Sequence, residues 1–427
     1  MSINIKEEKI GEIRFPAEFE PHHGTLLIWP ERPGSWGKDT SGAEKAYINI
    51  IKNLIQVEDV YLLVSKASFE AISTKLRDIF SDDYDNTERL SNDHDNTECL
   101  SNDHSISESS SDKKSVDDHS TNTSKSVSYK IGKFNLHIIE METDDSWARD
   151  TGPTFVFNKT GDVLSRIGIN WTFNAWGGEY DGLYASWDKD DKVAKNFTNY
   201  LGDKILDAGS FVLEGGSIHT DGERTLMVTE SCLLSKGRNP SLTKTEIEDT
   251  LKKFLGVEKV LWLPFGIYND ETNEHVDNVA AFIKPGEIVL AWTDNESDPQ
   301  YNMSKADYDY LSSETDAKGQ KLTIHKIPVP DIPVRCTEAD IDNYIFEPGE
   351  DEREAGERLA ASYVNFYFAN GCILLPQFGG ENEESDKRAQ AIFEKICSDK
   401  KIIPINTRSI LLGGGNIHCI TQQIPYI

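Results

Sequence analysis

The segment NGCILLPQFGGENEESDKRAQAIFEKICSDKKIIPI, residues 370–405, brings two apolar runs and a helical stretch together in immediate succession. CILLPQF (372–378) has the length and composition of a short buried strand, residues 385–397 are expected to form a helix, and KIIPI follows them. Residues 351–370 are predicted as a further helix, which the Asn370-Gly371 pair ends. This order of elements indicates a mixed α/β fold.

The same pattern continues on the N-terminal side. Residues 241–255 are predicted as a helix, because Thr243 and Glu246 have the spacing of a capping box and apolar residues recur at helical intervals after them. Further apolar runs of strand length lie at VYLLV (60–64), NLHIIEM (135–141) and VLWLP (260–264). The α/β character therefore extends over most of the chain.

Residues 81–128 differ from their surroundings. Ser, Asp, Asn, Thr and His dominate, and the ten-residue unit DNTERLSNDH (85–94) is followed by its near copy DNTECLSNDH (95–104). A segment with so few large apolar residues cannot offset the entropy lost on ordering. We expect a single domain over residues 1–427 that carries 81–128 as a low-complexity, disordered insertion; a metal site at His94, Cys99 and His104 is the less favoured interpretation.

Composition excludes several classes of function. The chain of 427 residues is 37% hydrophobic and has a formal net charge of −29, which disfavours nucleic acid as a partner because phosphate binding needs clustered Lys and Arg. No apolar run is long enough to cross a membrane, and the six cysteines include no CxxC pair. We expect a cytoplasmic protein with reduced thiols and no membrane partner. A small cationic substrate would suit this charge, although solubility explains most of it.

Two segments place carboxylates at strand ends. DDSWARDTGP (144–153) follows a predicted strand and puts Asp150 close to Trp147; a turn at Asp150 with Arg149 bridging a neighbour is the structural alternative. In FVLEGGSIHTDGERTLMVTE (211–230), Glu214 ends an apolar strand that would carry its carboxylate inward, where it needs a partner. His219 is expected at the surface or behind a site.

Two further segments carry an imidazole and a thiol. In NDETNEHVDNVAAFIKPGE (269–287), His275 and Asp277 point to the same side if the chain is extended there, and an acid beside an imidazole favours acid/base work near neutrality. LLGGGNIHCITQQIP (411–425) puts glycines, among them Gly414 and Gly415, before Cys419, so that the backbone can approach a ligand closely. Taken alone, an ordinary hydrogen-bonded histidine and a small core cysteine are the favoured interpretations.

Taken in this order, the four segments resemble the agmatine deiminases of the guanidine-modifying superfamily. The resemblance extends to FPAEFEPHHGTLLIWPERPGSWG (15–37), NWTFNAWGG (170–178), the run from Leu213 to Pro240 and AASYVNF (360–366), so it covers nearly all of the chain outside 81–128. It implies a five-bladed β/α propeller, or pentein, with the active site in a central channel. It also implies no cofactor, no metal, and a homo-oligomer, dimer or higher.

The resemblance assigns roles residue by residue. Cys419 matches the family nucleophile and His275 the general acid/base. The carboxylates that hold the guanidinium and orient the histidine are matched by Glu214, Asp277 and Asp150. Trp147 is similar to an aromatic residue beside the pocket. The implied reaction hydrolyses agmatine to N-carbamoylputrescine and ammonia through an S-amidino-cysteine intermediate, in polyamine metabolism. Arginine or peptidyl arginine is the alternative substrate.

One position departs from the family pattern, which usually has Gly immediately before the histidine, where this chain has Glu274. Either the turn there has lost its positive φ, or a further carboxylate sits near the site. Two other classes of function stay open at this stage. One is a metallohydrolase that uses His219, His275, His418 and Cys419, and the other is a non-catalytic binding protein of the same architecture.

Overall fold

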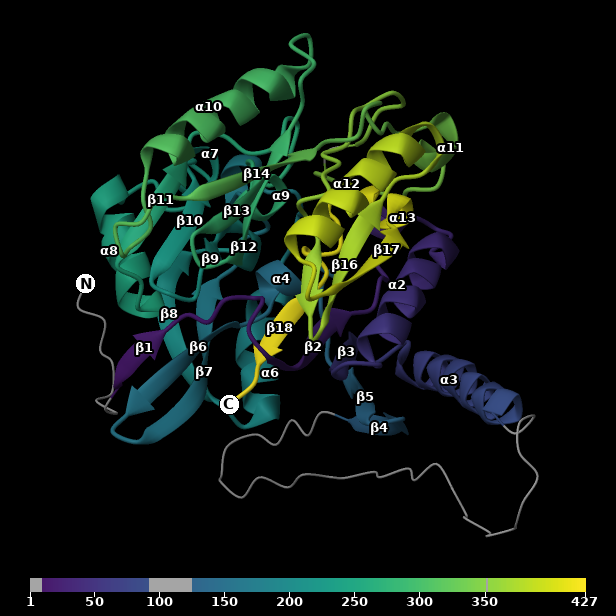
Figure 1. The fold of residues 1–427 in the computed structure, drawn as a ribbon. Helices are drawn as coiled ribbons and strands as arrows, with labels where there is room; N and C mark the ends of the chain where they lie inside the picture. The colour runs from purple at the N-terminus through teal and green to yellow at the C-terminus, as the bar shows by residue number, and fades with distance from the viewer. Residues whose placement is uncertain (1–9, 92–124, 351) are drawn as a thin grey trace.

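Five β-sheets flanked by helices make up the part of the protein that the structure describes (Figure 1). The computed structural model describes residues 10–91, 125–350 and 352–427. The largest sheet has the strand order β18-β2-β3-β5-β4, formed by Gln422–Pro425, His22–Ile28, Asp59–Val64, Phe134–Glu140 and Ser126–Ile131. The next has the order β1-β6-β7-β8, formed by Glu12–Arg14, Thr154–Thr160, Val163–Thr172 and Lys204–Val212.

The other three sheets have three strands each. Their orders are β11-β10-β9 (Lys259–Leu263, Thr225–Thr229, His219–Thr220), β12-β13-β14 (Ala280–Lys284, Glu287–Trp292, Thr323–Pro328) and β15-β16-β17 (Tyr367–Ala369, Cys372–Gln377, Lys401–Asn406). The mixed α/β fold expected from the sequence is confirmed.

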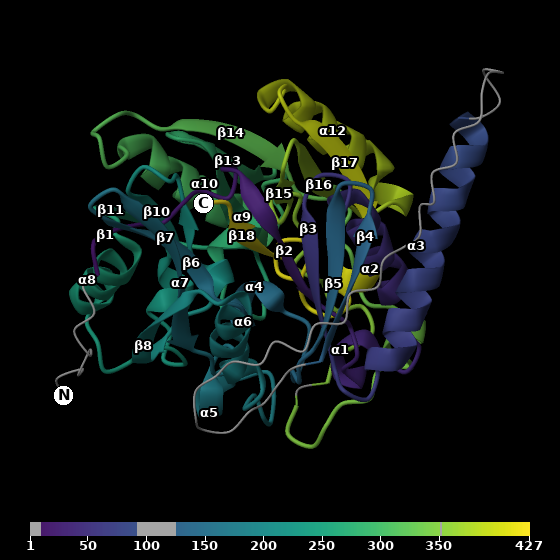
Figure 2. The ribbon, with the colours of Figure 1, turned by 90° about the horizontal axis from the view of Figure 1, so that it is seen from below.

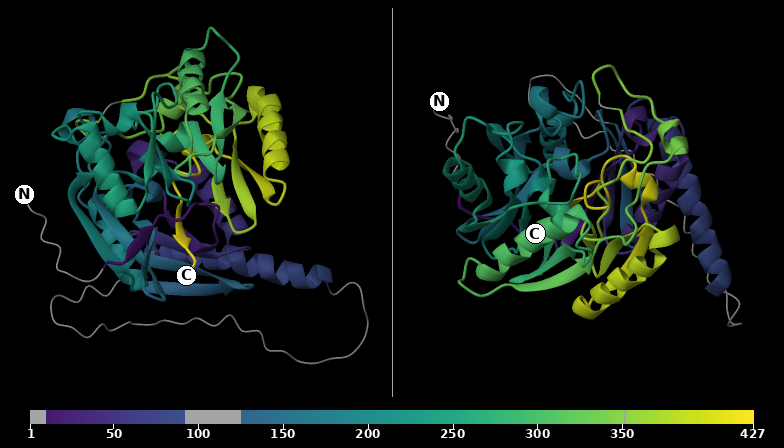
Figure 3. Two further views of the ribbon diagram at one scale, coloured as in Figure 1. Left: turned by 60° about the vertical axis from the view of Figure 1, so that its left-hand side comes forward. Right: turned by 90° about the horizontal axis from the view of Figure 1, so that it is seen from above.

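Every sheet contains the same local unit. Two antiparallel strands are followed by a helix and then by a third strand parallel to the second, as in β12, β13, α10 (Pro299–Ser313) and β14. The corresponding helices of the other sheets are α2 (Ser41–Leu54), α6 (Val193–Leu201), α8 (Lys244–Leu255) and α12 (Glu383–Ile396). These helices lie around the outside of the molecule (Figure 3).

The last strand completes the first unit. Strand β18 pairs antiparallel with β2, so Gln422 lies opposite Leu26 although nearly the whole chain separates them. Seen from below, β18 lies beside β2 in the interior, while α3 (Phe69–Ser91) runs along one edge (Figure 2). The C-terminal segment that carries Cys419 is therefore anchored in the sheet built from the N-terminal segment.

Local sequence explains the elements that were predicted correctly. Helix α8 begins after Thr243, which forms the expected capping box with Glu246, and it ends at Gly256, whose φ of 66° suits glycine. Its buried side chains are those of the predicted apolar stripe, Ile247, Leu251, Phe254 and Leu255. The four predicted strands quoted above appear as β3, β5, β11 and β16.

The helix predicted over residues 351–370 is wrong. Residues 352–366 form turns and irregular backbone, and Tyr367–Ala369 is strand β15. Long-range ion pairs hold this segment, since Arg353 binds Glu271 with an Nη2–Oε2 distance of 2.8 Å. Helix propensity is a weak preference that such tertiary contacts override.

The boundaries of the predicted insertion also differ from the structure. Helix α3 continues to Ser91 and strand β4 begins at Ser126, so both ends of 81–128 belong to regular elements. Most of the tandem repeat, including His94, Cys99 and His104, lies outside the described residues. Among the residues that are described, no helix is long and apolar enough to span a membrane.

Candidate active site

The predicted site residues come from equivalent places in the fold. Each lies in the short segment that precedes the first strand of the next unit: Asp150 in α4 (Ala148–Thr151) before β6, Glu214 before β9, and Cys419 before β18. His275 and Asp277 flank the start of α9 (Val276–Val279), directly before β12. Strand β15 is preceded in the same way by a residue not singled out from the sequence, Asn365.

Cys419 is half-buried, and its sulfur faces three polar atoms. Asn365 Nδ2 lies 3.2 Å and Asn365 Oδ1 3.4 Å from Sγ, and Asp277 Oδ2 lies 3.8 Å away. Burial raises the pKa of the Cys419 thiol well above its usual value, and the negative charges of Asp277 and Asp150 raise it further. The free protein therefore holds Cys419 as a neutral thiol at pH 7.

His275 is buried among acids rather than paired with Asp277. Its Nδ1 lies 3.9 Å from Asp150 Oδ2, and its Nε2 lies 3.9 Å from Glu214 Oε2. Burial opposes the charged form, but Asp150 and the neighbouring Cys232 outweigh it and raise the pKa of His275 to about 10. His275 is thus an imidazolium at neutral pH, and its Nε2 has no hydrogen-bond partner among the described residues.

Glycine at position 216 lets three catalytic candidates approach one another. A Cβ there would lie 2.6 Å from His275 Nδ1, 2.9 Å from Asp150 Oδ1 and 3.0 Å from Asp277 Oδ2. The Gly216 amide also donates to Asp150 Oδ1 at 2.8 Å. His275 and Asp277 do not lie in an extended chain, so the condition under which the sequence predicted a shared side is not met; the two side chains approach one another at Gly216 instead.

The two remaining carboxylates are held by different partners. Asp150 Oδ2 accepts from Trp176 Nε1 at 2.8 Å, which fixes the plane of the carboxylate. Glu214 is buried, as its apolar strand predicted, and its Oε1 lies 2.7 Å from Arg238 Nε in a buried ion pair. Burial raises the pKa of Asp150, although the nearby His275 opposes this shift.

A cavity of about 450 Å³ opens onto Cys419. Trp147, Trp176, Gly414 and Gly415 line it together with Asp150. A Cβ at Gly415 would lie 2.5 Å from the Trp147 ring and 3.1 Å from Cys419 Sγ, so only glycine leaves the thiol accessible there. The cavity therefore combines two aromatic rings with the cysteine and one carboxylate of the cluster.

The outer wall of the cavity is strongly acidic. Its arginines are already paired, Arg32 with Glu350 and Arg353 with Glu271. The carboxylates that line the cavity outnumber these two arginines: Asp150, Asp181, Asp270, Glu271, Glu350, Glu352 and Glu357. Such a wall favours a cation.

Both expectations about Glu274 are wrong. The residue keeps the positive φ, at 69°, that a glycine would adopt, so the turn is unchanged. Its carboxylate accepts from the Gly266 amide at 2.7 Å and does not line the cavity. The side chain thus supports a neighbouring turn while the backbone of Glu274 positions His275.

Sequence reasoning missed several residues that contact the cluster. All three lay in stretches quoted for their family resemblance, and no local pattern singled them out: Asn365, Trp176 and Arg238. His219 is buried, so the surface alternative for it is wrong; its Nδ1 accepts from the Phe282 amide at 3.3 Å. Arg149 does bridge a neighbour, as its Nη2 lies 2.9 Å from Glu18 Oε2.

Among the described residues, two clusters have donor atoms close enough together to be tested as metal sites. The first contains Glu18, His219 and His418, and the second contains Glu214, Cys232 and His275. In the first, the Arg149 guanidinium already occupies Glu18 and would repel a cation. In the second, Arg238 occupies Glu214, and a protonated His275 has no lone pair to offer a metal. Neither donor set suits a metal ion, and the histidines of the metallohydrolase interpretation fall in separate clusters.

The fold of the described residues is that of guanidine-modifying enzymes. Within that class the chain belongs to the family described as Porphyromonas-type peptidyl-arginine deiminase, whose model matches residues 14–425.

Relatives cover the chain from end to end. A Selenomonas ruminantium protein named "Putative agmatine deiminase" is 47% identical over 427 residues, 100% of each chain. A protein of the same name from Latilactobacillus sakei is 45% identical over 412 residues, 96% of each chain. The solved structure of the agmatine deiminase of Enterococcus faecalis has a TM-score of 0.79 and 36% identity and covers 97% of this chain and 96% of its own.

Proposed function

We propose that this protein hydrolyses the guanidinium group of agmatine to N-carbamoylputrescine and ammonia through a covalent S-amidino intermediate on Cys419. The observation that carries the proposal is the meeting of an imidazolium and two carboxylates around Gly216, with the Cys419 sulfur 3.8 Å from one of these carboxylates and at the wall of one acidic cavity. The agmatine deiminase names of close relatives support the same reaction.

The substrate is attacked as a cation. A guanidinium stays protonated over the whole physiological pH range, so no protein base neutralises it first. Asp150 and Asp277 would hold its plane by charge-assisted hydrogen bonds, with Cys419 on one face. The bound positive charge offsets the two carboxylates that raise the pKa of Cys419, so the thiolate forms when substrate arrives.

His275 then moves the protons. The thiolate attacks the guanidinium carbon, His275 gives its proton to the departing nitrogen, and the C–N bond breaks to release ammonia and leave an S-amidino cation. Neutral His275 next takes a proton from water as its oxygen attacks the same carbon. Cleavage of the C–S bond restores the thiolate and leaves His275 as the imidazolium, and the ureido product forms as its new hydroxyl gives its remaining proton to water. Glu214 would orient His275 from the side opposite Asp150.

The acidic cavity wall favours agmatine over arginine and peptidyl arginine. Agmatine carries a second cation at its far end, whereas arginine carries an α-carboxylate that needs a free cationic partner. Arg32 and Arg353 are the arginines lining the cavity, and both are neutralised by glutamates. Trp147, Gly414 and Gly415 would contact the substrate along its length.

The overall architecture, the location and the oligomeric state belong to the same proposal. The five ββαβ units would be the blades of a five-bladed propeller around the channel that holds the site. The five described cysteines are free thiols, which supports a cytoplasmic location. The proposed reaction belongs to polyamine metabolism. A homo-oligomer remains our expectation from the family, with no nucleic-acid or membrane partner.

The decisive experiment compares ureido-product formation from agmatine, arginine and a peptidyl arginine at equal concentrations, with wild type and Cys419→Ala in parallel. We expect wild type to turn over agmatine. Turnover of arginine and of the peptidyl arginine should be at least about 100-fold weaker, an order-of-magnitude estimate for the loss of one buried ionic contact. Cys419→Ala should turn over none of the three substrates. Activity that a strong chelator abolishes would instead revive the metallohydrolase interpretation, and unchanged activity in Cys419→Ala would exclude the covalent route.

A further inference from the structure

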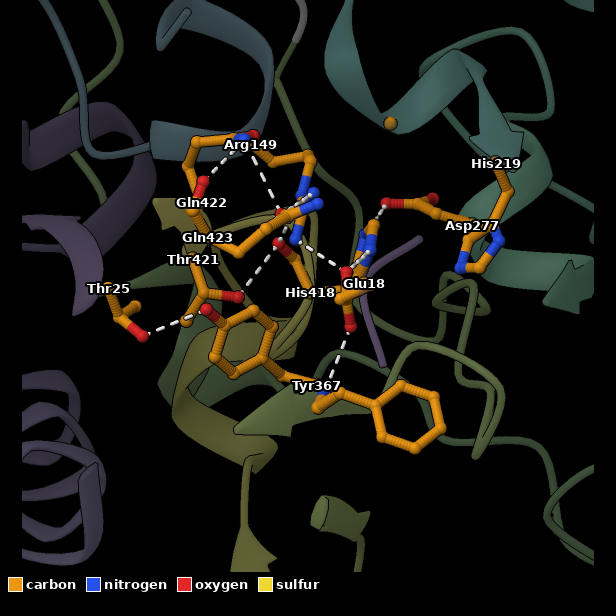
Figure 4. Close-up of polar contacts among 12 residues, drawn as sticks. Glu18, Thr25, Arg149, His219, Asp277, Tyr367, His418, Thr421, Gln422 and Gln423 are labelled. Carbon is orange, nitrogen blue, oxygen red and sulfur yellow. Dashed lines mark hydrogen bonds and ion pairs between the residues drawn. The ribbon is translucent and has the colours of Figure 1, made fainter. Parts of the chain in front are cut away.

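His418, the residue before the cysteine, is enclosed by two buried carboxylates. Its Nδ1 lies 2.7 Å from Asp277 Oδ2, and its Nε2 lies 2.7 Å from Glu18 Oε2 (Figure 4). A carboxylate oxygen only accepts hydrogen bonds, so a neutral ring would turn a bare nitrogen toward one of the two acids. Both nitrogens must therefore carry hydrogen, which makes His418 an imidazolium.

The far carboxylate of this arrangement is itself fixed. Glu18 Oε1 accepts from the Phe368 amide at 2.9 Å, and Glu18 Oε2 lies 2.9 Å from Arg149 Nη2. Arg149 returns to the same segment of chain, because its amide donates to the carbonyl oxygen of Cys419 at 3.1 Å. Glu18 and Arg149 therefore fix the position of the His418 ring relative to Cys419.

The near carboxylate belongs to the site. Asp277 Oδ2 is shared between His418 and the cysteine, whose sulfur lies 3.8 Å away, and Asp277 Oδ1 has no partner among the described residues. Asp277 is buried close to Asp150 and Cys419, an environment that would favour its protonation. His418 is the cation that contacts it directly.

We propose that His418 is a positioning residue for the reaction: its buried imidazolium, clamped by Glu18, keeps Asp277 ionised and fixed beside Cys419, ready to bind a guanidinium. The inference rests on the proposed function, since it assigns a second role within that site. It explains why a buried histidine is directly next to the nucleophile although its ring points away from the substrate cavity, which it does not line.

The charged groups around His418 define what its loss would do. Asp277 and Glu18 face the ring nitrogens, the Arg149 guanidinium lies on the far side of Glu18, and His219 stacks on the ring at 6.0 Å between centroids. Removing the imidazolium removes the cation in contact with Asp277, so the pKa of Asp277 rises. Protonated Asp277 binds a cation poorly, and activity would then be lost at a higher pH than in wild type.

A graded pair of substitutions separates this role from simple packing. His418→Asn keeps an amide N–H near the position of Nδ1 but no charge, and His418→Leu keeps neither. We expect the acid limb of kcat/KM for agmatine to move up by about one to three pH units in His418→Asn, the usual effect of one contacting charge, with much of the rate recovered at high pH. His418→Leu should not recover. His219→Gln removes the ring that stacks on His418 but leaves the contact between His418 and Asp277 in place, so its pH profile should match that of wild type.

A second readout does not need turnover. The amidinium 2-chloroacetamidine and the neutral 2-chloroacetamide both alkylate a thiolate with loss of chloride, so the ratio of their rates at Cys419 reports the negative charge beside it. We expect wild type and His219→Gln to react faster with the cationic reagent than with the neutral one. In His418→Asn the ratio of the two rates near pH 6 should fall at least about tenfold, the equivalent of one pKa unit. Unchanged ratios and an unmoved acid limb in a folded His418→Asn would overturn the inference. Absence of agmatine turnover in wild type with the expected reagent ratios would overturn the proposed function alone.

Discussion

Asn365 contacts the Cys419 sulfur through both ends of its amide, with Nδ2 at 3.2 Å and Oδ1 at 3.4 Å from Sγ. Oδ1 also accepts from the His418 amide at 3.0 Å, which fixes the orientation of the side chain. A thiol can donate to Oδ1, whereas a thiolate needs the Nδ2–H donor. Asn365 therefore fits both protonation states of the nucleophile.

Replacing this amide should slow the attack. A hydrogen bond to a charged group contributes about 1.5 to 3 kcal/mol, so we expect Asn365→Ala to lower kcat/KM for agmatine by about 10- to 100-fold. Asn365→Asp adds a third negative charge beside the sulfur and should be slower still. Steady-state kinetics with thermal unfolding as the control for folding tests this, and an alanine variant as active as wild type would contradict it.

The raised pKa of the Cys419 thiol predicts a substrate-dependent thiolate. Below its pKa a thiol is neutral, so free enzyme at pH 7 should show little thiolate absorbance near 240 nm, a general property of thiolates. An unreactive guanidine analogue should increase the absorbance, because its charge opposes Asp277 and Asp150. Subtracting the spectrum of Cys419→Ala removes the contribution of the other thiols. Equal thiolate absorbance with and without analogue would refute the idea.

His275 gives a pH signature in stability. Its pKa is about 10 in the folded protein and 6.5 as the reference, so it stabilises the fold fully below about pH 6.5, and this contribution is lost as pH rises through about 10. The free energy of unfolding of wild type, relative to that of His275→Gln, should therefore decrease as the pH rises from about 6.5 to about 10. Denaturant titrations of both proteins at pH 6, 8 and 10 measure the difference. A constant difference would mean that His275 is not protonated in the folded state.

Local pattern predicted the elements whose stability is local. The capping box of Thr243 and the apolar stripe after it determine α8, and the apolar run before Glu214 correctly placed that carboxylate inside. The helix prediction over residues 352–366 was wrong because their conformation depends on contacts such as that of Arg353 with Glu271, 82 positions apart. Propensity alone carries no information about such a partner.

The site was predictable only as a set of residue types. Cys419, His275 and the acids were assigned by resemblance, but their pairing was not: Asp277 binds His418 across 141 positions, and Glu18 binds the same ring across 400. The pair of Glu18 and His418 forms because strand β18 joins β2 and brings the two ends of the chain together. No periodicity in the sequence encodes that closure.

The expected insertion can be tested through the residues between α3 and β4. The site residues come from other parts of the chain, so replacing residues 92–124 by a Gly/Ser linker should leave kcat and KM for agmatine unchanged. Activity assays with circular dichroism as the folding control test it. Loss of turnover in a folded variant would show that the segment contributes to catalysis.

Glu274 allows the cost of its backbone to be separated from the contribution of its side chain. A left-handed conformation costs an L residue about 1 to 2 kcal/mol relative to glycine, while the Glu274 carboxylate repays part of this by binding the Gly266 amide. Glu274→Ala keeps the strain and loses the contact, and Glu274→Gly loses both. We therefore expect the glycine variant to be more stable than the alanine variant by about 1 kcal/mol in urea denaturation. Because the turn before His275 keeps its shape with glycine, Glu274→Gly should hold kcat within about twofold of wild type, the change expected when no catalytic contact is lost. An alanine variant equal in stability to the glycine variant would mean that the positive φ at this position carries no strain.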